Sequence, residues 1–424
     1  MHNKENHKSS FPSLLLITVI FFTSSLIALF LNIPISRITT NFNYSVIIIL
    51  ITMELFTNLI IETGIMQYIA IKLSLFSKAN KKVCIILFGL LMFFVSMVLN
   101  NITAVLITLP VILALLKVLD IDKLYIAKFF CVILALSNTG GAASPIGDFP
   151  AIVIMTSGIT NFTGYLFRAL PLFLITSIII LFIWSFNIKD KKNLKKSQLL
   201  AIDLLQSRYK NLTVRKDVLV PLGIILLLMF IAWSVIPQTV IPSEIIALLG
   251  YCLGMVVASN KGIKVTQMID MKSILTISSF LFFSTVISET EVLNKIVEII
   301  EPSIQNPKIF LIVIMIISSL ISGLVSAGPA SAAMMPIIVN LCNSTFSSCS
   351  DWVAIAYAAS ICAGSSMFLW SATAGFILSE KFNASCIECN GKKQTWGVVQ
   401  YLKYGLVNYS VQMIVAIIFI LIVI

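Results

Sequence analysis

A short polar stretch interrupts a hydrophobic part of the chain and holds the residues best able to do chemistry. It reads S-N-T-G-G-A-A-S-P-I-G-D-F-P, covers residues 137–150, and lies between the apolar runs CVILAL and AIVIM. Glycine and proline disfavour a regular helix between Asn138 and Pro150, so we expect an unwound segment between two half-helices there. The freed carbonyls of such a segment, together with the partial charges at half-helix ends, can coordinate a cation.

Asp148 contributes the charge of this stretch. A carboxylate inside a membrane span is costly and usually marks an ion ligand or a proton carrier. The alternative is that Asp148 caps the following half-helix through its N-terminal amides, and the two roles are compatible. We predict that Asp148 is the principal ligand of a transported Na⁺, helped by neutral oxygens of the same stretch, which hard cations prefer: Ser137, Asn138, Thr139 and Ser144.

The elements that hold this stretch are predicted to be membrane helices. The 424-residue chain is 58% hydrophobic and 11% charged, whereas soluble domains carry about 25% charged residues. Long apolar runs recur, each sufficient to cross a hydrocarbon core of about 30 Å. The sequence therefore predicts an all-α polytopic membrane protein with the lipid bilayer as its partner. Much of the formal charge of +11 lies between Lys189 and Lys216, which indicates a cytoplasmic loop rather than a nucleic-acid surface.

Landmarks recur in two hydrophobic halves of the chain. Glu62-Thr63 is matched 227 residues later by Glu289-Thr290, and the stretch that starts at Ser137 is matched by G-S-S-M-F-L-W-S-A-T-A-G from Gly364. An ordered series of this kind predicts an internal duplication. The predicted organisation is a first transmembrane repeat at residues 1–187, a basic cytoplasmic linker at 188–217 and a second repeat at 218–424.

The placement of lysines predicts that the two repeats are inverted. Residues 83–118 are too many for one span and carry lysines at both ends, which indicates a re-entrant hairpin that enters from the cytoplasm with its tip at Asn100-Asn101. The corresponding run, 309–341, is followed by CNSTFSSCSD, which has no Lys or Arg, and is expected to enter from outside. Inverted repeats with broken helices are typical of secondary transporters, whose site lies near the midplane. The N-terminus is predicted to be cytoplasmic.

The hairpin tip and the second broken helix supply further polar groups to the predicted site. Such side chains often serve only to join helices by hydrogen bonds. We regard these as candidate ion or substrate ligands because they lie at the two breaks. They are Asn100, Asn101, Thr103, Ser365, Ser366, Ser371 and Thr373.

Several other residues receive plainer interpretations. Glu54 lies in a span without an obvious partner, and Arg168 is expected to extend to the membrane surface. Cys342 and Cys349 flank a serine-rich outer loop in which a disulfide is an option. The C-x-x-C at 386–389 is half of a zinc site, and a fortuitous pair is the preferred interpretation.

Three segments resemble one known group of transporters. GGAASPIGDFP followed by AIVIMTSG is similar to a segment of NhaD-type sodium/proton antiporters, in the ion transporter superfamily, which also holds arsenite permeases, the P-protein group and citrate or dicarboxylate carriers. LNNITAVLITLP resembles the first hairpin tip of that family, and AGSSMFLWSATAG its second broken helix. The chain departs from the family pattern at Asn100, where aspartate is common, and at Ser326-Ala327, where the second tip lacks its acid.

The resemblance implies a secondary transporter of the bacterial inner membrane that exchanges Na⁺ or Li⁺ for H⁺ by alternating access, with Asp148 carrying the exchange. A sodium- or proton-coupled carrier of dicarboxylate, citrate or arsenite-like anions stays open, because the S-N-T of 137–139 resembles dicarboxylate carriers and half-helix N-termini bind anions. An enzyme is not expected, since the sequence holds no second intramembrane aspartate and no H-E-x-x-H. No cofactor is predicted, and a homodimer is left open.

Overall fold

The computed structural model describes residues 11–78, 80–118, 121–186, 188, 213–263, 271–290, 306–389 and 392–423. Within these ranges the protein is almost entirely helical, apart from a two-stranded ladder in which Glu388 pairs with Lys393. Most of the predicted linker, the stretch after Thr290, and both histidines of the sequence lie outside the described residues. The expected repeat and linker boundaries are therefore not tested and stay predictions.

The helices of the first half follow the apolar runs of the sequence, and a proline or a polar cap marks many of their ends. Asn43, Asn80 and Asp122 each accept a hydrogen bond from a first-turn amide of the helix that follows. The helices are α1 (Phe11–Phe30), α2 (Ile35–Asn41), α3 (Tyr44–Glu62), α4 (Ile65–Phe76), α5 (Lys81–Ser96), α6 (Asn101–Val118), α7 (Lys123–Ala142), α8 (Phe149–Thr156) and α9 (Phe162–Phe186).

The second half repeats this order of a hairpin followed by a broken helix. Its elements are α11 (Lys216–Val235), α12 (Ser243–Asn260), α13 (Met271–Ser288), α15 (Pro307–Val325), α16 (Ala327–Asn343), α17 (Ser350–Ser365), α18 (Gly375–Ala384), β1 (Glu388–Cys389), β2 (Lys392–Lys393) and α19 (Val398–Val423). The predicted hairpins are thus α5–α6 and α15–α16, and their turns lie at the predicted tips.

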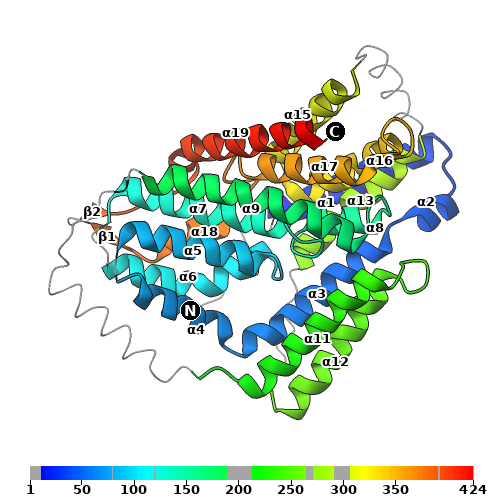
Figure 1. Cartoon of the computed structure of the whole chain (residues 1–424). Coiled ribbons are helices and arrows are strands. Elements are labelled where there is room, and N and C mark those ends of the chain that lie inside the picture. Colours follow the sequence, from blue (N-terminus) through cyan, green and yellow to red (C-terminus); the bar gives the residue numbers. More distant parts are fainter. Residues whose placement is uncertain are drawn as a thin grey trace.

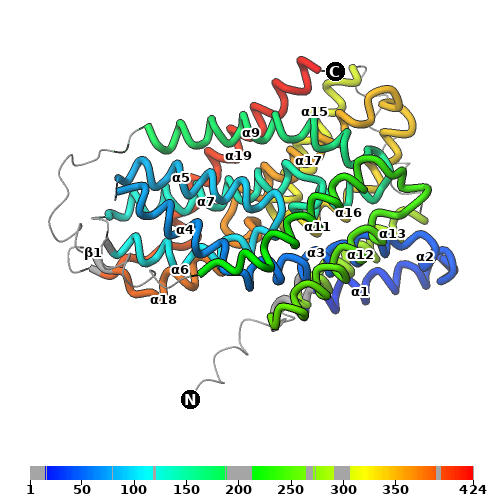
Figure 2. The backbone as a smooth tube through the Cα atoms, turned by 60° about the horizontal axis from the view of Figure 1, so that its bottom comes forward, coloured from blue at the N-terminus to red at the C-terminus, as the bar shows by residue number. Residues whose placement is uncertain are grey.

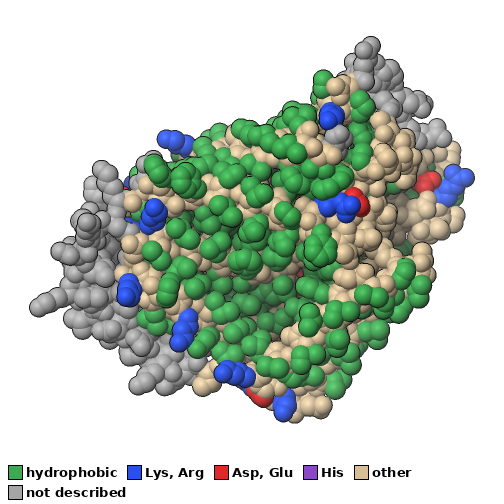
Figure 3. All heavy atoms as spheres, viewed as in Figure 1, with side chains coloured by type: hydrophobic (Ala, Val, Ile, Leu, Met, Phe, Trp, Pro, Cys, Tyr) green, Lys and Arg blue, Asp and Glu red, His purple; other side chains and the backbone are tan. Residues whose placement is uncertain are grey.

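The prediction of a polytopic α-helical membrane protein is confirmed. Among the described residues, seven helices are long and apolar enough to cross a membrane: α3, α7, α9, α11, α12, α15 and α19. Figure 3 shows a broad hydrophobic surface on which Lys and Arg gather toward the margins. Large side chains such as Phe22, Leu228 and Phe182 are exposed, which is the pattern of a lipid-facing surface.

The helices form two groups that meet along one seam (Figures 1 and 2). In the first group, α3 packs against α12, α11 against α12, and α1 against α13. The second group holds both hairpins, both broken helices, α9 and α19. The hairpins α5–α6 and α15–α16 lie toward opposite ends of the molecule (Figures 1 and 2). Helix α13 contacts α16, and α3 contacts α8, so α8 and α16 lie where the two groups meet.

The two broken helices run in opposite directions alongside each other. Phe130, in the first half of α7, packs against Phe382 near the end of α18, with ring centroids 5.0 Å apart. At the other end, the Ser350 hydroxyl at the start of α17 donates to the carbonyl of Ile159, just beyond α8. The start of each broken helix therefore lies beside the end of the other.

The first break is shorter than the sequence suggested. We expected unwound chain from Asn138, but α7 continues through Ala142, and only residues 143–148 interrupt the path to α8. Gly140 stays helical because it packs on α5, where an added Cβ would collide with the backbone carbonyl of Phe93. Gly364 on α17 has the same role against the carbonyl of Ser319 on α15. These glycines allow close helix packing instead of breaking a helix.

Candidate functional site

The centre of the first break is a chain of three polar side chains from three segments. Asp148 precedes α8, where its Oδ1 accepts a hydrogen bond from the Phe149 amide at 2.9 Å, so it does cap the half-helix. Its Oδ2 accepts a second bond, at 3.1 Å, from the Asn101 amide group at the start of α6. The same Asn101 nitrogen lies 3.5 Å from Oδ1 of Asn138 on α7. The hairpin tip and the broken helix are thereby joined through the carboxylate.

Asn101 has a side-chain oxygen without a hydrogen-bond partner beside Asp148. The side chain is 1% exposed, and its Oδ1 is a buried oxygen with no hydrogen-bond partner among the described residues. A Cβ added at Gly141 would lie 2.9 Å from both this oxygen and Cβ of Asp148, so the two groups face the same small space. A buried acceptor beside a carboxylate is the donor set that a hard cation takes.

A small cavity of about 30 Å³ adjoins the carboxylate. Its wall includes Asp148, Gly147, Asn100 from the hairpin turn, and Glu54 and Thr57 from α3. Space for a single water requires at least about 10–15 Å³, so the cavity accommodates a water or a small ion but no organic acid. Glu54, to which the sequence assigned no partner, therefore faces the same cavity as Asp148.

The two breaks meet at Asn138. Its Nδ2 donates to the hydroxyls of Ser365 at 3.1 Å and Ser366 at 3.2 Å, at the end of α17. Both hydroxyls also donate to the carbonyl of Cys362, which fixes their orientation. Ser371 shapes the second break from within, because its hydroxyl accepts the Phe368 amide and lies near three carbonyls of the same turn.

The ends of the broken helices carry a matching tyrosine contact. Tyr165 on α9 donates to the carbonyl of Ala142, the last residue of α7, at 2.8 Å. Tyr401 on α19 donates to the carbonyl of Ser366, just after α17, also at 2.8 Å. Each tyrosine satisfies a carbonyl that the break deprives of its helical partner.

The remaining predicted residues are arranged differently. Ser137 contacts Ser96 at 3.0 Å and Thr139 contacts Ser177 at 2.8 Å, so both join helices. Ser144 accepts the Ile146 amide within the break itself. Thr103 is half-buried on α6 and, among the described residues, takes part in none of these contacts or cavity walls. Of the predicted set, the structure thus brings Asp148, Asn100, Asn101, Asn138, Ser365 and Ser366 together.

A second cavity, of about 290 Å³, lies beside the second hairpin tip. It is lined by Lys272 and Thr276 of α13, Ser326 and Gly328 at the tip, and Thr373 before α18, with further walls from Ile102, Phe149, Ile277, Pro329 and Ile377. Neither α16 nor α18 has a side-chain cap, and Gly328 and Ile377, in the first turns of these helices, line this cavity. A lysine near two uncapped helix N-termini favours an anion.

The sequence did not indicate Lys272 as a site residue. A lysine at the start of a span is the ordinary mark of a cytoplasmic helix end, so its type carried no further signal. Ser326 adds an unusual backbone, with φ 131° and ψ 167°, a region that side chains other than glycine rarely adopt. In the sequence, Ser326 stood out only as part of the second tip, which lacks its acid.

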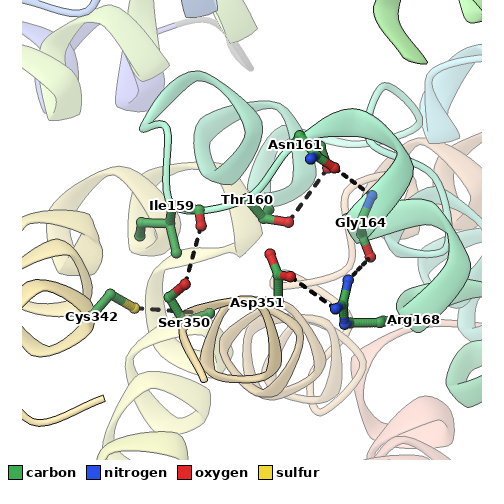
Figure 4. A network of polar contacts seen from close by, with 8 residues as sticks. All are labelled: Ile159, Thr160, Asn161, Gly164, Arg168, Cys342, Ser350 and Asp351. Carbon is green, nitrogen blue, oxygen red and sulfur yellow. Dashed lines mark hydrogen bonds and ion pairs between the residues drawn. The ribbon is translucent and has the colours of Figure 1, made fainter. Parts of the chain in front are cut away.

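Arg168, which we expected to extend to the membrane surface, keeps 31% of its side chain exposed and also has partners on a neighbouring helix. Its guanidinium forms an ion pair at 3.0 Å with Asp351 at the start of α17 and stacks over the Trp352 ring. It also donates to the carbonyl of Gly164, and Figure 4 shows its contacts with Gly164 and Asp351. The paired carboxylate and the aromatic ring both attract the guanidinium, which stays partly exposed to water. This network joins the two halves at the end of the molecule remote from the lysines of α5 and α6.

The two cysteines that flank the serine-rich loop are separate thiols. Cys342 and Cys349 are both free, so the disulfide that the sequence left open is not formed. Cys342 instead lies 3.9 Å from the carbonyl of Ser350, as Figure 4 shows. Among the described side chains, no cluster of three or more His, Cys, Asp or Glu could hold a metal ion. Cys386 is a free exposed thiol, and the side chain of Cys389 is outside the described residues.

Comparison of the sequence with known proteins relates the chain to a group of transporters. A sequence model described as "Citrate transporter" matches residues 9–362. The "46 kDa membrane protein" of Mycobacterium leprae is 24% identical over 309 residues, which cover 71% of this chain and 70% of the relative. "Uncharacterized transporter Rv2684" of Mycobacterium tuberculosis is 24% identical over 306 residues, covering 71% and 69%. The "P protein" of Mus musculus is 29% identical over 143 residues, covering 31% of this chain and 17% of the relative.

Proposed function

Because the chain belongs to the citrate transporter family, we propose that it carries an organic anion of the citrate class across the membrane, coupled to a cation bound at Asp148. This is the alternative that the sequence left open. The sodium/proton exchange implied by the resemblance to NhaD-type antiporters takes second place, because the matched family is described by its organic anion.

The cavity beside the second hairpin tip is the observation that carries this proposal. At about 290 Å³ it is close to the size of pockets that hold small organic ligands, about 300–1,000 Å³. Lys272 offers a charge to one carboxylate, and the amides of α16 and α18 offer hydrogen bonds to another. Thr276 and Thr373 supply hydroxyls for the remaining polar groups of the acid.

The cation has a separate position at the first break. Asp148, the unpartnered oxygen of Asn101 and the cavity that reaches Glu54 would hold Na⁺, or a proton on Asp148. Phe149 borders both cavities, so the cation and anion positions are neighbours on the two sides of one residue. Binding of one ion would then stabilise the other by attraction of opposite charges across this short separation.

The transport cycle in this proposal is alternating access between two inverted repeats. Such an arrangement is supported by the antiparallel broken helices and by the hairpins toward opposite ends. It is also supported by corresponding contacts in the two halves, those of Gly140 and Gly364 with a neighbouring hairpin and those of Tyr165 and Tyr401 with the end of a broken helix. The lysines that begin or end α5, α6 and α13 support a cytoplasmic position for these helix ends, and hence for the N-terminus. We place the protein in the bacterial inner membrane, alone or as a homodimer.

Exchange of Na⁺ for H⁺ is the second candidate function. It is favoured by the size of the cavity at Asp148, which admits a small ion and excludes an organic acid. In this alternative a proton and Na⁺ compete for the carboxylate, and the cavity with Lys272 has no substrate.

Uptake by the purified protein in proteoliposomes separates the two candidates. We expect radiolabelled citrate to accumulate when Na⁺ or a proton gradient is imposed, and unlabelled dicarboxylates and tricarboxylates to compete. Lys272→Gln should lower citrate uptake at least tenfold. Its matched control is Lys261→Gln, at the end of α12, which should leave the uptake unchanged. Collapse of a pH gradient on addition of Na⁺, in the absence of any carboxylate and with no citrate uptake, would establish the antiporter instead.

A further inference from the structure

Two cavities lie at successive levels of one seam between α8, α13 and α16. The cavity with Lys272, called here the inner cavity, has Phe149, Ile277 and Gly328 in its wall, one residue from each helix. A larger cavity of about 520 Å³, called here the outer cavity, has Val153, Leu281 and Ala332 in its wall, again one from each helix. On every helix the second residue follows the first by four positions, which is about one helical turn or 6 Å.

At the inner level, Gly328 touches both Phe149 and Ile277. A Cβ added at Gly328 would lie 3.4 Å from Cγ1 of Ile277 and 3.4 Å from Cγ of Phe149, so the glycine is in contact with both side chains. Phe149 and Ile277 are at most 6% exposed, although each borders a cavity. These side chains therefore close the seam between the cavities with dry, apolar surface.

The outer level continues the same closure. Val153, Leu281 and Ala332 are buried, and the packing of α16 on both α8 and α13 brings them to one place. The apolar layer between the cavities is thus only about one helical turn thick. A polar solute cannot cross such a layer unaided, since it would lose its hydrogen bonds to water without replacement.

The outer cavity has a neutral polar lining suited to a hydrated solute. Among the described residues, its wall includes amides and hydroxyls from the ends of α2, α8, α13 and α16: Asn41, Asn43, Ser157, Ser284, Thr285, Ser288, Asn340 and Asn343. These groups can replace water around either a carboxylate or a cation. These side chains carry no formal charge, so they would not hold either the anion or the cation in place.

We propose that the transported molecule crosses the protein along the seam between α8, α13 and α16, and that Phe149, Ile277 and Gly328 form the barrier between the two cavities. The inference rests on the proposed transporter function but not on the identity of the substrate. The absence of a side chain at Gly328 sets the width of the seam, because α8 and α13 both contact α16 at that residue. The proposed cation and anion positions both border Phe149. Movement of this one ring would therefore open the path to the outer cavity for an ion at either position.

Cysteine accessibility tests the barrier without knowledge of the substrate. Ser157→Cys reports on the outer cavity and Thr276→Cys on the inner one, both half-buried positions. Each is placed in a background with Cys252→Ser, Cys349→Ser, Cys386→Ser and Cys389→Ser, because Cys252 and Cys386 are exposed, Cys349 is half-buried and the side chain of Cys389 lies outside the described residues. A charged, membrane-impermeant methanethiosulfonate is applied to intact cells and to inside-out vesicles. We expect the two cysteines to react at least tenfold faster from opposite sides of the membrane.

Removal of the ring is expected to breach the barrier. Adding Phe149→Ala should raise the reaction of Thr276→Cys from the Ser157 side at least tenfold, whereas Phe173→Ala, an equally buried phenylalanine on α9, should not. Ile277→Ala provides a second breach, and gel filtration verifies that each variant remains folded. The proposal is overturned if Ser157→Cys and Thr276→Cys react from the same side, or if neither folded breach variant raises the rate.

The outcomes also separate this proposal from the proposed function. Opposite-side labelling with a breach at Phe149, but without citrate uptake, contradicts the citrate assignment and supports the seam. If the protein takes up citrate but the rate of cysteine labelling does not change in Phe149→Ala or Ile277→Ala, the proposed path along the seam is contradicted and the citrate assignment is not.

Discussion

Asn138 donates a hydrogen bond to Ser365, and the two residues are 227 positions apart, the same offset by which Glu62-Thr63 recurs as Glu289-Thr290. In a pair of repeats related by a two-fold axis, a residue on the axis contacts its own equivalent. The bond therefore lies where such an axis would cross the molecule, between the ends of α7 and α17. It also links the hairpin tip at Asn101 to the second break, because Asn138 contacts both.

A double-mutant cycle on Asn138→Ala and Ser365→Ala measures this link. We expect a coupling of about 0.5–1.5 kcal/mol, the usual contribution of one buried hydrogen bond, from thermal unfolding in detergent. Ser234→Ala, which removes an exposed hydroxyl bonded only within α11, is the control and should show no coupling to Asn138→Ala. Additive effects of Asn138→Ala and Ser365→Ala would contradict a joint role.

Replacement of Asp148 by asparagine tests the cation position. Asp148→Asn retains a good helix cap for α8, since asparagine and aspartate cap equally well, so the fold should persist. It removes the charge that we propose binds the cation, and we expect coupled uptake to fall at least 100-fold. The control is Asp217→Asn, an exposed carboxylate paired with Arg215, which should transport normally. Full activity of Asp148→Asn would exclude this carboxylate from the coupling step.

Asn101 and Thr103 lie two residues apart on α6 and are expected to differ sharply. Asn101→Ala removes both the hydrogen bond to Asp148 and the unpartnered oxygen, so the Na⁺ concentration for half-maximal uptake should rise about tenfold or more. Thr103→Ala should change it less than twofold, because the structure leaves this hydroxyl outside the site. Sodium titrations of uptake at fixed citrate make the comparison. Equal effects of both substitutions would contradict the geometry described for Asn101.

The two packing glycines predict matched losses of stability. Gly140→Ala and Gly364→Ala each force a methyl group against a backbone carbonyl of the neighbouring hairpin, which should cost about 1–3 kcal/mol. Gly223→Ala on α11 meets no atom within 4 Å and should be neutral or stabilise by about 0.5–1 kcal/mol, because alanine favours helix. Unfolding temperatures by tryptophan fluorescence test all three. A neutral Gly140→Ala would show that α5 and α7 can separate without loss.

Much of the fold could be predicted because hydrophobicity and proline act locally. The runs 83–118 and 309–341 became the hairpins α5–α6 and α15–α16 with outer ends shifted by at most two residues, and the predicted tip at Asn100-Asn101 became the start of α6. The first break shows the limit of this reasoning, because we expected it to begin at Asn138 and α7 instead continues to Ala142. Glycine lowers helix propensity wherever it stands, and only the neighbouring helix α5 determines whether it breaks α7 or lets a partner approach.

The sequence alone determined that this chain crosses the membrane repeatedly, that two of its helices are interrupted, and that one interruption carries the carboxylate of Asp148, because each of these follows from local composition. Only the tertiary structure decided which polar groups meet. It paired Asn138 with Ser365, turned Glu54 toward the cavity of Asp148, joined Arg168 to Asp351, and placed Lys272 beside the second tip. Contacts between residues so far apart depend on how whole helices pack, and no local pattern of residue types specifies that packing.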